Sequence, residues 1–85
     1  MGNCGDNEGK PIVLVFDCIS YGKHEINCMD GLTLKKVLGE LSRRIRLPQS
    51  KIVDVQYRYE SLNKAKKIRE LNLPNWAVLL VKLSD

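Results

Sequence analysis

The chain has 85 residues, a length that fits one small domain. Hydrophobic residues make up 44% of it and charged residues 28%, as in ordinary globular proteins, which excludes a disordered or collagen-like chain. The net charge of +4 suits a protein partner with an acidic surface, but it excludes the dense basic stripe typical of nucleic-acid-binding proteins.

Residues 1–10, MGNCGDNEGK, contain almost nothing that a core could bury, and we expect a flexible tail before a domain spanning residues 11–85. Within the tail, Gly2 and Cys4 fit the start of a myristoylated and palmitoylated protein. That motif requires Ser or Thr at the place of Asp6, so we expect Gly2 and Cys4 to be unmodified. If both residues were modified, the chain would be a lipidated peripheral membrane protein, which we keep as the second alternative to the functions considered below.

The segments that follow predict a hairpin and then a helix. Residues 12–16 are a β-branched and aromatic run, and residues 24–29 alternate in polarity after a short turn. Residues 33–46 form an amphipathic helix, with Thr33 as the N-cap. The apolar side chains of this helix recur every three or four residues, at Leu34, Val37, Leu38, Leu41 and Ile45.

The second half of the chain predicts two further strands and an irregular crossing. Residues 51–59 alternate, with Asp54, Gln56 and Arg58 facing solvent and Val53, Val55, Tyr57 and Tyr59 facing the core. Residues 60–67 read as a loop with a short edge strand, and a brief helical turn follows. Residues 76–83 form the most hydrophobic strand, which we place centrally in the sheet. We expect Trp76 to cap one end of the core; an exposed Trp76 would instead be a binding anchor.

This order predicts an α+β domain, a mixed four- to five-stranded sheet packed on one main helix, and it resembles the ubiquitin-like β-grasp fold. The resemblance rests on the opening hairpin, on Thr33-Leu34 and Leu47-Pro48 around the helix, and on residues 68–73 before the last strand. Two branches are similar in more detail. Arg43-Arg44 with Leu73-Pro74-Asn75 resembles the N-terminal domain of TUG-type tether proteins, and residues 30–34 resemble the helix entry of Raf-like Ras-binding domains.

The resemblance implies a non-catalytic protein–protein interaction module of an adaptor or tether protein. Conjugated relatives end in Gly-Gly, whereas this chain ends with residues 82–85, KLSD, so we expect no conjugation. The alternative is a Ras-type small-GTPase binding domain. The three cysteines lack paired spacing, which favours reduced thiols, and we expect a cytoplasmic or nuclear monomer.

Two surfaces are candidates for binding a partner protein. The first is the open face of the sheet, where the outward positions are Val78, Leu80, Lys82, Gln56 and Arg58. The second is a basic surface formed by the hairpin edge and the outer helix face, with Lys23, Lys35, Lys36, Arg43 and Arg44.

Residues suited to catalysis or metal binding are sparse. His24 is the one histidine, and although Cys18, His24 and Cys28 share the predicted hairpin, the spacing of a four-ligand metal site is missing. Because Cys28 follows the buried alternation, we interpret it as a packed thiol. We therefore expect no metal, no cofactor and no enzymatic activity.

Overall fold

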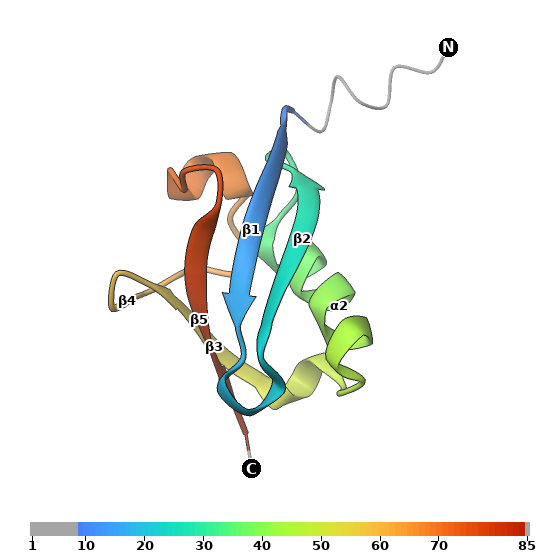
Figure 1. Cartoon of the computed structure of the whole chain (residues 1–85). Coiled ribbons are helices and arrows are strands. Elements are labelled where there is room, and N and C mark those ends of the chain that lie inside the picture. Colours follow the sequence, from blue (N-terminus) through green and yellow to red (C-terminus); the bar gives the residue numbers. More distant parts are fainter. Residues whose placement is uncertain (1–8, 85) are drawn as a thin grey trace.

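The computed structural model describes residues 9–84, which fold into one five-stranded mixed sheet with one long helix across it (Figure 1). The strand order across the sheet is β2-β1-β5-β3-β4. The strands are β1 (Pro11–Asp17), β2 (Lys23–Met29), β3 (Ile52–Tyr57), β4 (Glu60–Ser61) and β5 (Ala77–Leu83). The helix is α2 (Leu34–Ile45), and three 3-10 turns lie at η1 (Ile19–Tyr21), η2 (Gln49–Lys51) and η3 (Ile68–Leu71).

Strand pairing confirms the predicted α+β class and the central place of the last strand. β1 pairs antiparallel with β2 and parallel with β5, and β5 pairs antiparallel with β3. The predicted tail falls mostly on residues 1–8, so Gly2 and Cys4 lie outside the described residues. Lys10 is described, and its N–H donates to Asp30 Oδ1 at 2.9 Å. No helix among residues 9–84 is long and apolar enough to cross a membrane.

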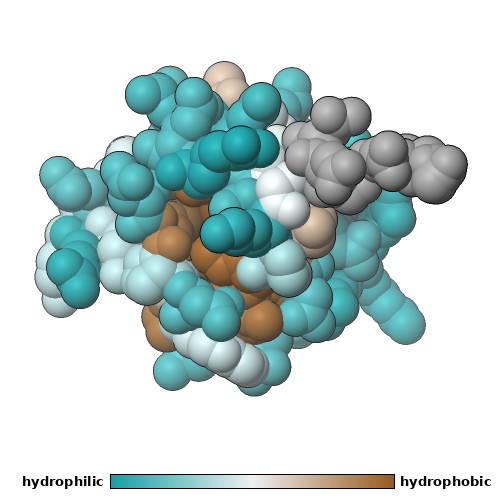
Figure 2. All heavy atoms as spheres, turned by 90° about the horizontal axis from the view of Figure 1, so that it is seen from above, coloured by the Kyte–Doolittle hydropathy of each residue, from teal (hydrophilic) through white to brown (hydrophobic). Residues whose placement is uncertain are grey.

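The core lies between α2 and the face of the sheet that the helix covers. All five apolar helix positions predicted from spacing are buried, and they pack against inward side chains of the strands. The buried strand residues include Leu14, Phe16, Ile26, Val55, Leu79 and Val81. Seen from above, hydrophilic side chains surround a central group of hydrophobic atoms (Figure 2).

The ends of α2 explain why this segment becomes a helix of this length. Thr33 Oγ1 accepts the Lys36 N–H at 3.3 Å, as an N-cap does, and Arg46 ends the helix in the left-handed region with a φ of 59°. The first two helical N–H groups are also satisfied, because Leu34 donates to Lys66 O and Lys35 to Lys64 O. The segment after β4 therefore covers the N-terminal end of α2.

The predicted facing of residues 51–59 is wrong at both ends. A register shift between Ile52 and Asp54 puts Ile52 in the core and leaves Val53 54% exposed. The strand then stops at Tyr57, because Arg58 and Tyr59 form the two-residue turn to β4 with φ values of 54° and 69°. Tyr59 is consequently 95% exposed rather than buried.

The predicted capping role of Trp76 is also wrong. The side chain is 54% exposed, and the residue has a φ of 66°. Its N–H donates to Val13 O at 2.7 Å, while the neighbouring Asn75 Oδ1 accepts the Val13 N–H at 2.7 Å. These two bonds extend the contact between β1 and β5 and hold Trp76 at the surface.

Candidate protein-interaction surfaces

The open face of the sheet displays the outward residues of β5 beside those of its neighbours. Val78, Leu80 and Lys82 alternate with the buried Ala77, Leu79 and Val81, as predicted. Leu80 lies between Asp17 of β1 and Gln56 of β3, because the strand register pairs it with both. Val78 is 50% exposed, which is high for a strand valine in the middle of a sheet.

A shallow hollow of about 240 Å³ lies on this face at the turn between β3 and β4. We call its lining the sheet-face patch: Asp17, Gln56, Arg58, Tyr59, Val78 and Leu80. Four of the five predicted sheet-face residues belong to the patch, and Lys82 lies on the same face beside Asp54. Sequence reasoning missed Tyr59 and Asp17, since the first was assigned to the core and the second was not considered.

Asp54 fixes the polar side of the open face through three hydrogen bonds. Ser61 Oγ and Gln56 Nε2 donate to Oδ2 at 2.8 and 3.1 Å, and the Val55 N–H donates to Oδ1 at 3.0 Å. The hydrogen bond from Ser61 is the main cause that lowers the pKa of Asp54 below its ordinary value of 3.8, with the Gln56 and Val55 bonds and the charge of Lys82 adding to it. Gln56 is thereby oriented within the patch.

This network predicts an acid-dependent loss of stability. Because the pKa of Asp54 is lower in the folded protein, its carboxylate stabilises the fold above the unfolded pKa, and that contribution is lost as the pH falls through the folded pKa. We expect Asp54→Asn to lower the stability at pH 7 and to flatten the decline of stability with pH below 3.8. Urea denaturation measured across pH tests this, with Asp17→Asn as the control. An unchanged pH profile would contradict the prediction.

The outer edge of β2 presents unpaired backbone groups. The N–H and C=O of Val13 point toward β5, so the alternate residues of β1 point toward β2. The antiparallel register then turns the backbone groups of Glu25 and Asn27 outward. No strand among residues 9–84 pairs with this edge, but Arg44 Nη1 donates to Glu25 O at 3.1 Å. One guanidinium therefore covers part of an edge that can otherwise accept a strand.

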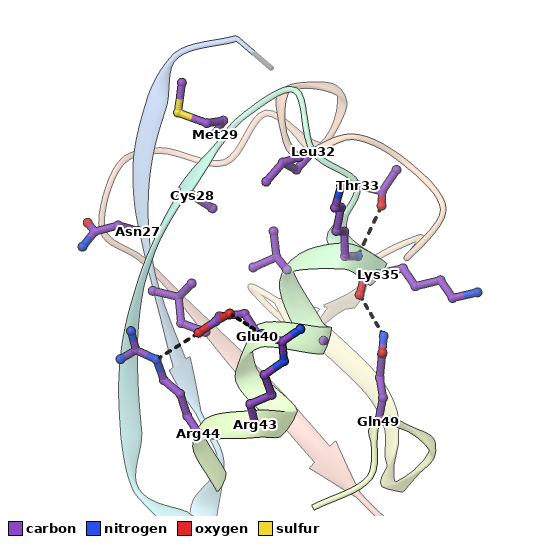
Figure 3. Close-up of a pocket in the computed structure, with 14 residues that line it drawn as sticks. Asn27, Cys28, Met29, Leu32, Thr33, Lys35, Glu40, Arg43, Arg44 and Gln49 are labelled. Carbon is purple, nitrogen blue, oxygen red and sulfur yellow. Dashed lines mark hydrogen bonds and ion pairs between the residues drawn. The ribbon is translucent and has the colours of Figure 1, made fainter. Parts of the chain in front are cut away.

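A groove of about 750 Å³ runs between β2 and α2, and we call it the basic groove (Figure 3). Ile26, Leu32 and Val37 contribute apolar surface to its lining. The charged residues of the lining are Lys35, Lys36, Glu40, Arg43 and Arg44. Glu40 lies 3.8 Å from Arg43 and 3.9 Å from Arg44, and all three side chains are substantially exposed, so these ion pairs are weak.

The predicted basic surface is therefore gathered only in part. Four of the five predicted residues, Lys35, Lys36, Arg43 and Arg44, line the basic groove. Lys35 extends from the side of α2 that faces away from β2 (Figure 3). Lys23 is exposed at the start of β2, beside Asp17, and does not line the groove.

The hairpin cysteines lie in protected positions. Cys18 is buried, and burial raises its pKa. Burial, with a contribution from Asp30, raises the pKa of Cys28 to about 11. Thiols in this state are poor nucleophiles at neutral pH. His24 Nε2 lies 2.8 Å from Tyr21 O, and within the described chain no three potential ligands gather into a metal site.

Comparison with known proteins shows the class of fold on which these surfaces lie. No protein-family profile matches the sequence, and no curated protein matches it. Solved structures do match. A chain from a structure on molecular mimicry of SUMO that promotes DNA repair has a TM-score of 0.80 at 14% identity, over 87% of this chain and 92% of that one. The chain thus has a ubiquitin-like β-grasp fold.

Two further matches support the same class. The C-terminal ubiquitin-like domain of mouse tubulin-specific chaperone e has a TM-score of 0.71 at 24% identity, over 91% of this chain and 90% of that one. The ubiquitin of Caldiarchaeum subterraneum has a TM-score of 0.78 at 12% identity, over 88% of this chain and 95% of that one. At these identities the likeness shows the fold, and the closer resemblance to TUG-type or Raf-like domains stays a prediction.

Proposed function

We propose that this domain is a non-catalytic protein-interaction module of an adaptor or tether protein and that it binds its partner through the sheet-face patch. The observation that carries the proposal is the combination of the half-exposed Val78 with Leu80 and the almost fully exposed Tyr59 around one hollow. Apolar side chains rimmed by polar ones, here Asp17 and Arg58, are typical of protein-interaction sites. Aromatic residues in such sites often dominate the binding energy.

The outer edge of β2 supports a second candidate function, that of a domain that binds a Ras-type small GTPase. The GTPase would supply an acidic edge strand that pairs with β2. Glu25 and Asn27 turn backbone groups outward there, and the basic groove lies beside them. A partner strand would pair with β2 while its acidic side chains meet Arg43 and Arg44. Such a partner must first displace the hydrogen bond from Arg44 to Glu25 O.

Charge-reversed and apolar-to-acidic variants separate the two modes. Partners are captured from eukaryotic cytosol on the wild-type domain, and each is then titrated against variants by isothermal calorimetry. We expect Val78→Glu and Leu80→Glu each to weaken binding at least about thirtyfold, the loss of a buried apolar anchor. Arg43→Glu combined with Arg44→Glu should leave that binding within about threefold, since charges at the rim of an interface change affinity little.

The reverse pattern, loss only in the arginine variant, would favour the second candidate. A GTPase loaded with a GTP analogue then provides the direct ligand, and binding only in that state would support it. A partner whose affinity is unchanged by all three variants would contradict both binding modes. Thermal melting of each variant checks that the fold is intact, which matters most for Leu80 because it is partly buried.

A further inference from the structure

Five lysines gather where the N-terminal end of α2 meets the segment after β4. We call them the lysine cluster: Lys35, Lys36, Lys64, Lys66 and Lys67. Backbone contacts hold the two segments together. The Lys35 N–H donates to Lys64 O at 2.9 Å, the Leu34 N–H donates to Lys66 O at 3.0 Å, and Thr33 pairs with Lys67 in an antiparallel bridge. The fold thereby brings like charges from distant parts of the sequence to one corner.

Lysines outnumber acidic side chains at this corner. α2 has no acidic residue in its first turn, and within residues 9–84 none of the five lysines forms an ion pair. Of the nearby acids, Glu40 pairs with Arg43 and Arg44, and Glu70 accepts the backbone N–H of Lys67 at 2.8 Å. Cations at a helix N-terminus oppose the helix dipole, and they also repel one another. The arrangement disfavours folding, and an acidic ligand would relieve it.

A hollow of about 540 Å³ opens beside the cluster, between α2 and the start of β3. The buried Leu38 and Ile52 form its floor, the exposed Ala65 adds apolar surface, and the cations in its lining are Lys35 and Lys64. Lys64 Nζ is held there by Ile52 O at 3.5 Å and by Val53 O at 3.4 Å. The Lys35 side chain extends on this side of the helix, away from β2 (Figure 3), and the residue lines both this hollow and the basic groove.

We propose that the lysine cluster and this hollow bind an acidic peptide segment of a partner protein, with an apolar side chain of the peptide in the hollow and neighbouring carboxylates on the lysines. Lipid headgroups and nucleic-acid phosphates match the charge but bring no apolar side chain. Among residues 9–84, none of those lining the hollow is aromatic, so they offer no platform on which bases stack. The hollow is distinct from the sheet-face patch and from the outer edge of β2, so the site goes beyond the function proposed above, although Lys35 and Lys36 also line the basic groove.

An amide NMR titration of the labelled full chain tests this site directly. The probe is a short synthetic peptide in which glutamates surround a pair of leucines, and the matched control replaces each glutamate by glutamine. We expect saturable shift changes in residues 35–39, 49–52 and 64–67 with the acidic peptide and none with the glutamine peptide. The affinity should fall, and the Kd rise, when the salt concentration is increased, because salt screens the exposed charges that bind the peptide.

Lys35→Glu combined with Lys66→Glu gives the second readout. We expect binding at least about tenfold weaker, together with a higher melting temperature, because the new charges favour the helix dipole and relieve repulsion. Lys64 is left intact since its ammonium supports β3. As a matched charge reversal, Lys10→Glu with Lys23→Glu, at two exposed lysines that line neither the hollow nor the basic groove, should keep the affinity.

Three results would overturn the proposal. The first is no saturable shift up to about 1 mM peptide, the weak limit of specific binding. The second is equal binding of the glutamine peptide. The third is that phosphatidylserine vesicles or an RNA oligonucleotide bind more tightly than the peptide, and that Lys35→Glu with Lys66→Glu abolishes this tighter binding. The lysine cluster would then be a site for lipid headgroups or for RNA.

Discussion

Replacing Arg58 by asparagine and Tyr59 by glycine should stabilise the protein by about 2 kcal/mol in the free energy of unfolding. Both residues have left-handed backbone conformations, with φ values of 54° and 69°, which cost L-residues energy. Asn-Gly is the favoured pair in a two-residue hairpin turn of this kind. In a domain of this size the change corresponds to a rise in melting temperature of roughly 8–16 °C. Thermal denaturation followed by circular dichroism measures it.

The single replacement Tyr59→Gly serves as the matched control, and about half of the gain is expected from it. The double variant also loses the cation–π contact of Arg58 with the Tyr57 ring, 5.3 Å to the centroid. This loss costs about 0.5 kcal/mol at an exposed site, and the expected gain of about 2 kcal/mol is net of it. An unchanged or lower melting temperature would contradict the prediction. It would mean that the side chains of Arg58 and Tyr59 stabilise the fold by at least as much as their left-handed backbone conformations cost.

The strained turn bears on the proposed sheet-face binding because it displays Tyr59 at the edge of the sheet-face patch. Strained residues persist where the surrounding structure enforces them, and they are frequent at binding sites. The stabilised double variant should therefore bind a sheet-face partner more weakly, while a partner at the basic groove should not distinguish the two proteins. Stability and binding would then change in opposite directions, which a folding defect cannot produce.

The sequence predicts best where a local period and a cap agree. Residues 33–46 show an apolar spacing that only a helix places on one face, and Thr33 adds a cap, so the helix is found within one residue at either end. The alternation of Val78, Leu80 and Lys82 was likewise sufficient to place these residues outward, because β5 is regular along its length.

The errors fall where one residue interrupts a period. Val53 and Val55 look alike in sequence, but the irregularity between Ile52 and Asp54 turns Val53 to solvent. A bulge of this kind depends on how β3 pairs with β5, and this pairing cannot be predicted from the sequence of β3 alone. Tyr59 was assigned inward by continuing the same alternation past the end of the strand, and Trp76 by its position after Pro74-Asn75 at the start of the last strand.

Tertiary contacts also decide which charges become neighbours. Lys35 and Arg44 both belong to the predicted basic surface, but they leave α2 in different directions, and only Arg44 reaches Glu25 O. The lysine cluster depends instead on the contact of residues 64–67 with the N-terminal end of α2. The unfavourable placement of Lys35 and Lys36 in the first helical turn was its one signal in the sequence.

Replacing Phe16 by alanine should have the largest effect on the fold itself. Phe16 is fully buried on β1, and the register places it between His24 of β2 and Leu79 of β5. Truncating such a side chain costs about 3–5 kcal/mol through lost burial and the cavity left behind. An 85-residue domain has a total stability of about 4–13 kcal/mol. Urea denaturation should therefore show a much lower midpoint with a similar slope.

Val15→Ala is the matched control, because Val15 immediately precedes Phe16 on β1 but points to the open face. The register pairs it with Val78, so its loss should cost about 1 kcal/mol or less in stability. Equal destabilisation by the two variants would contradict a core that lies only on the helix side of the sheet. Because Val15 also adjoins the sheet-face patch, its truncation should weaken a sheet-face partner while the domain stays folded, whereas Phe16→Ala should affect partners at every surface alike.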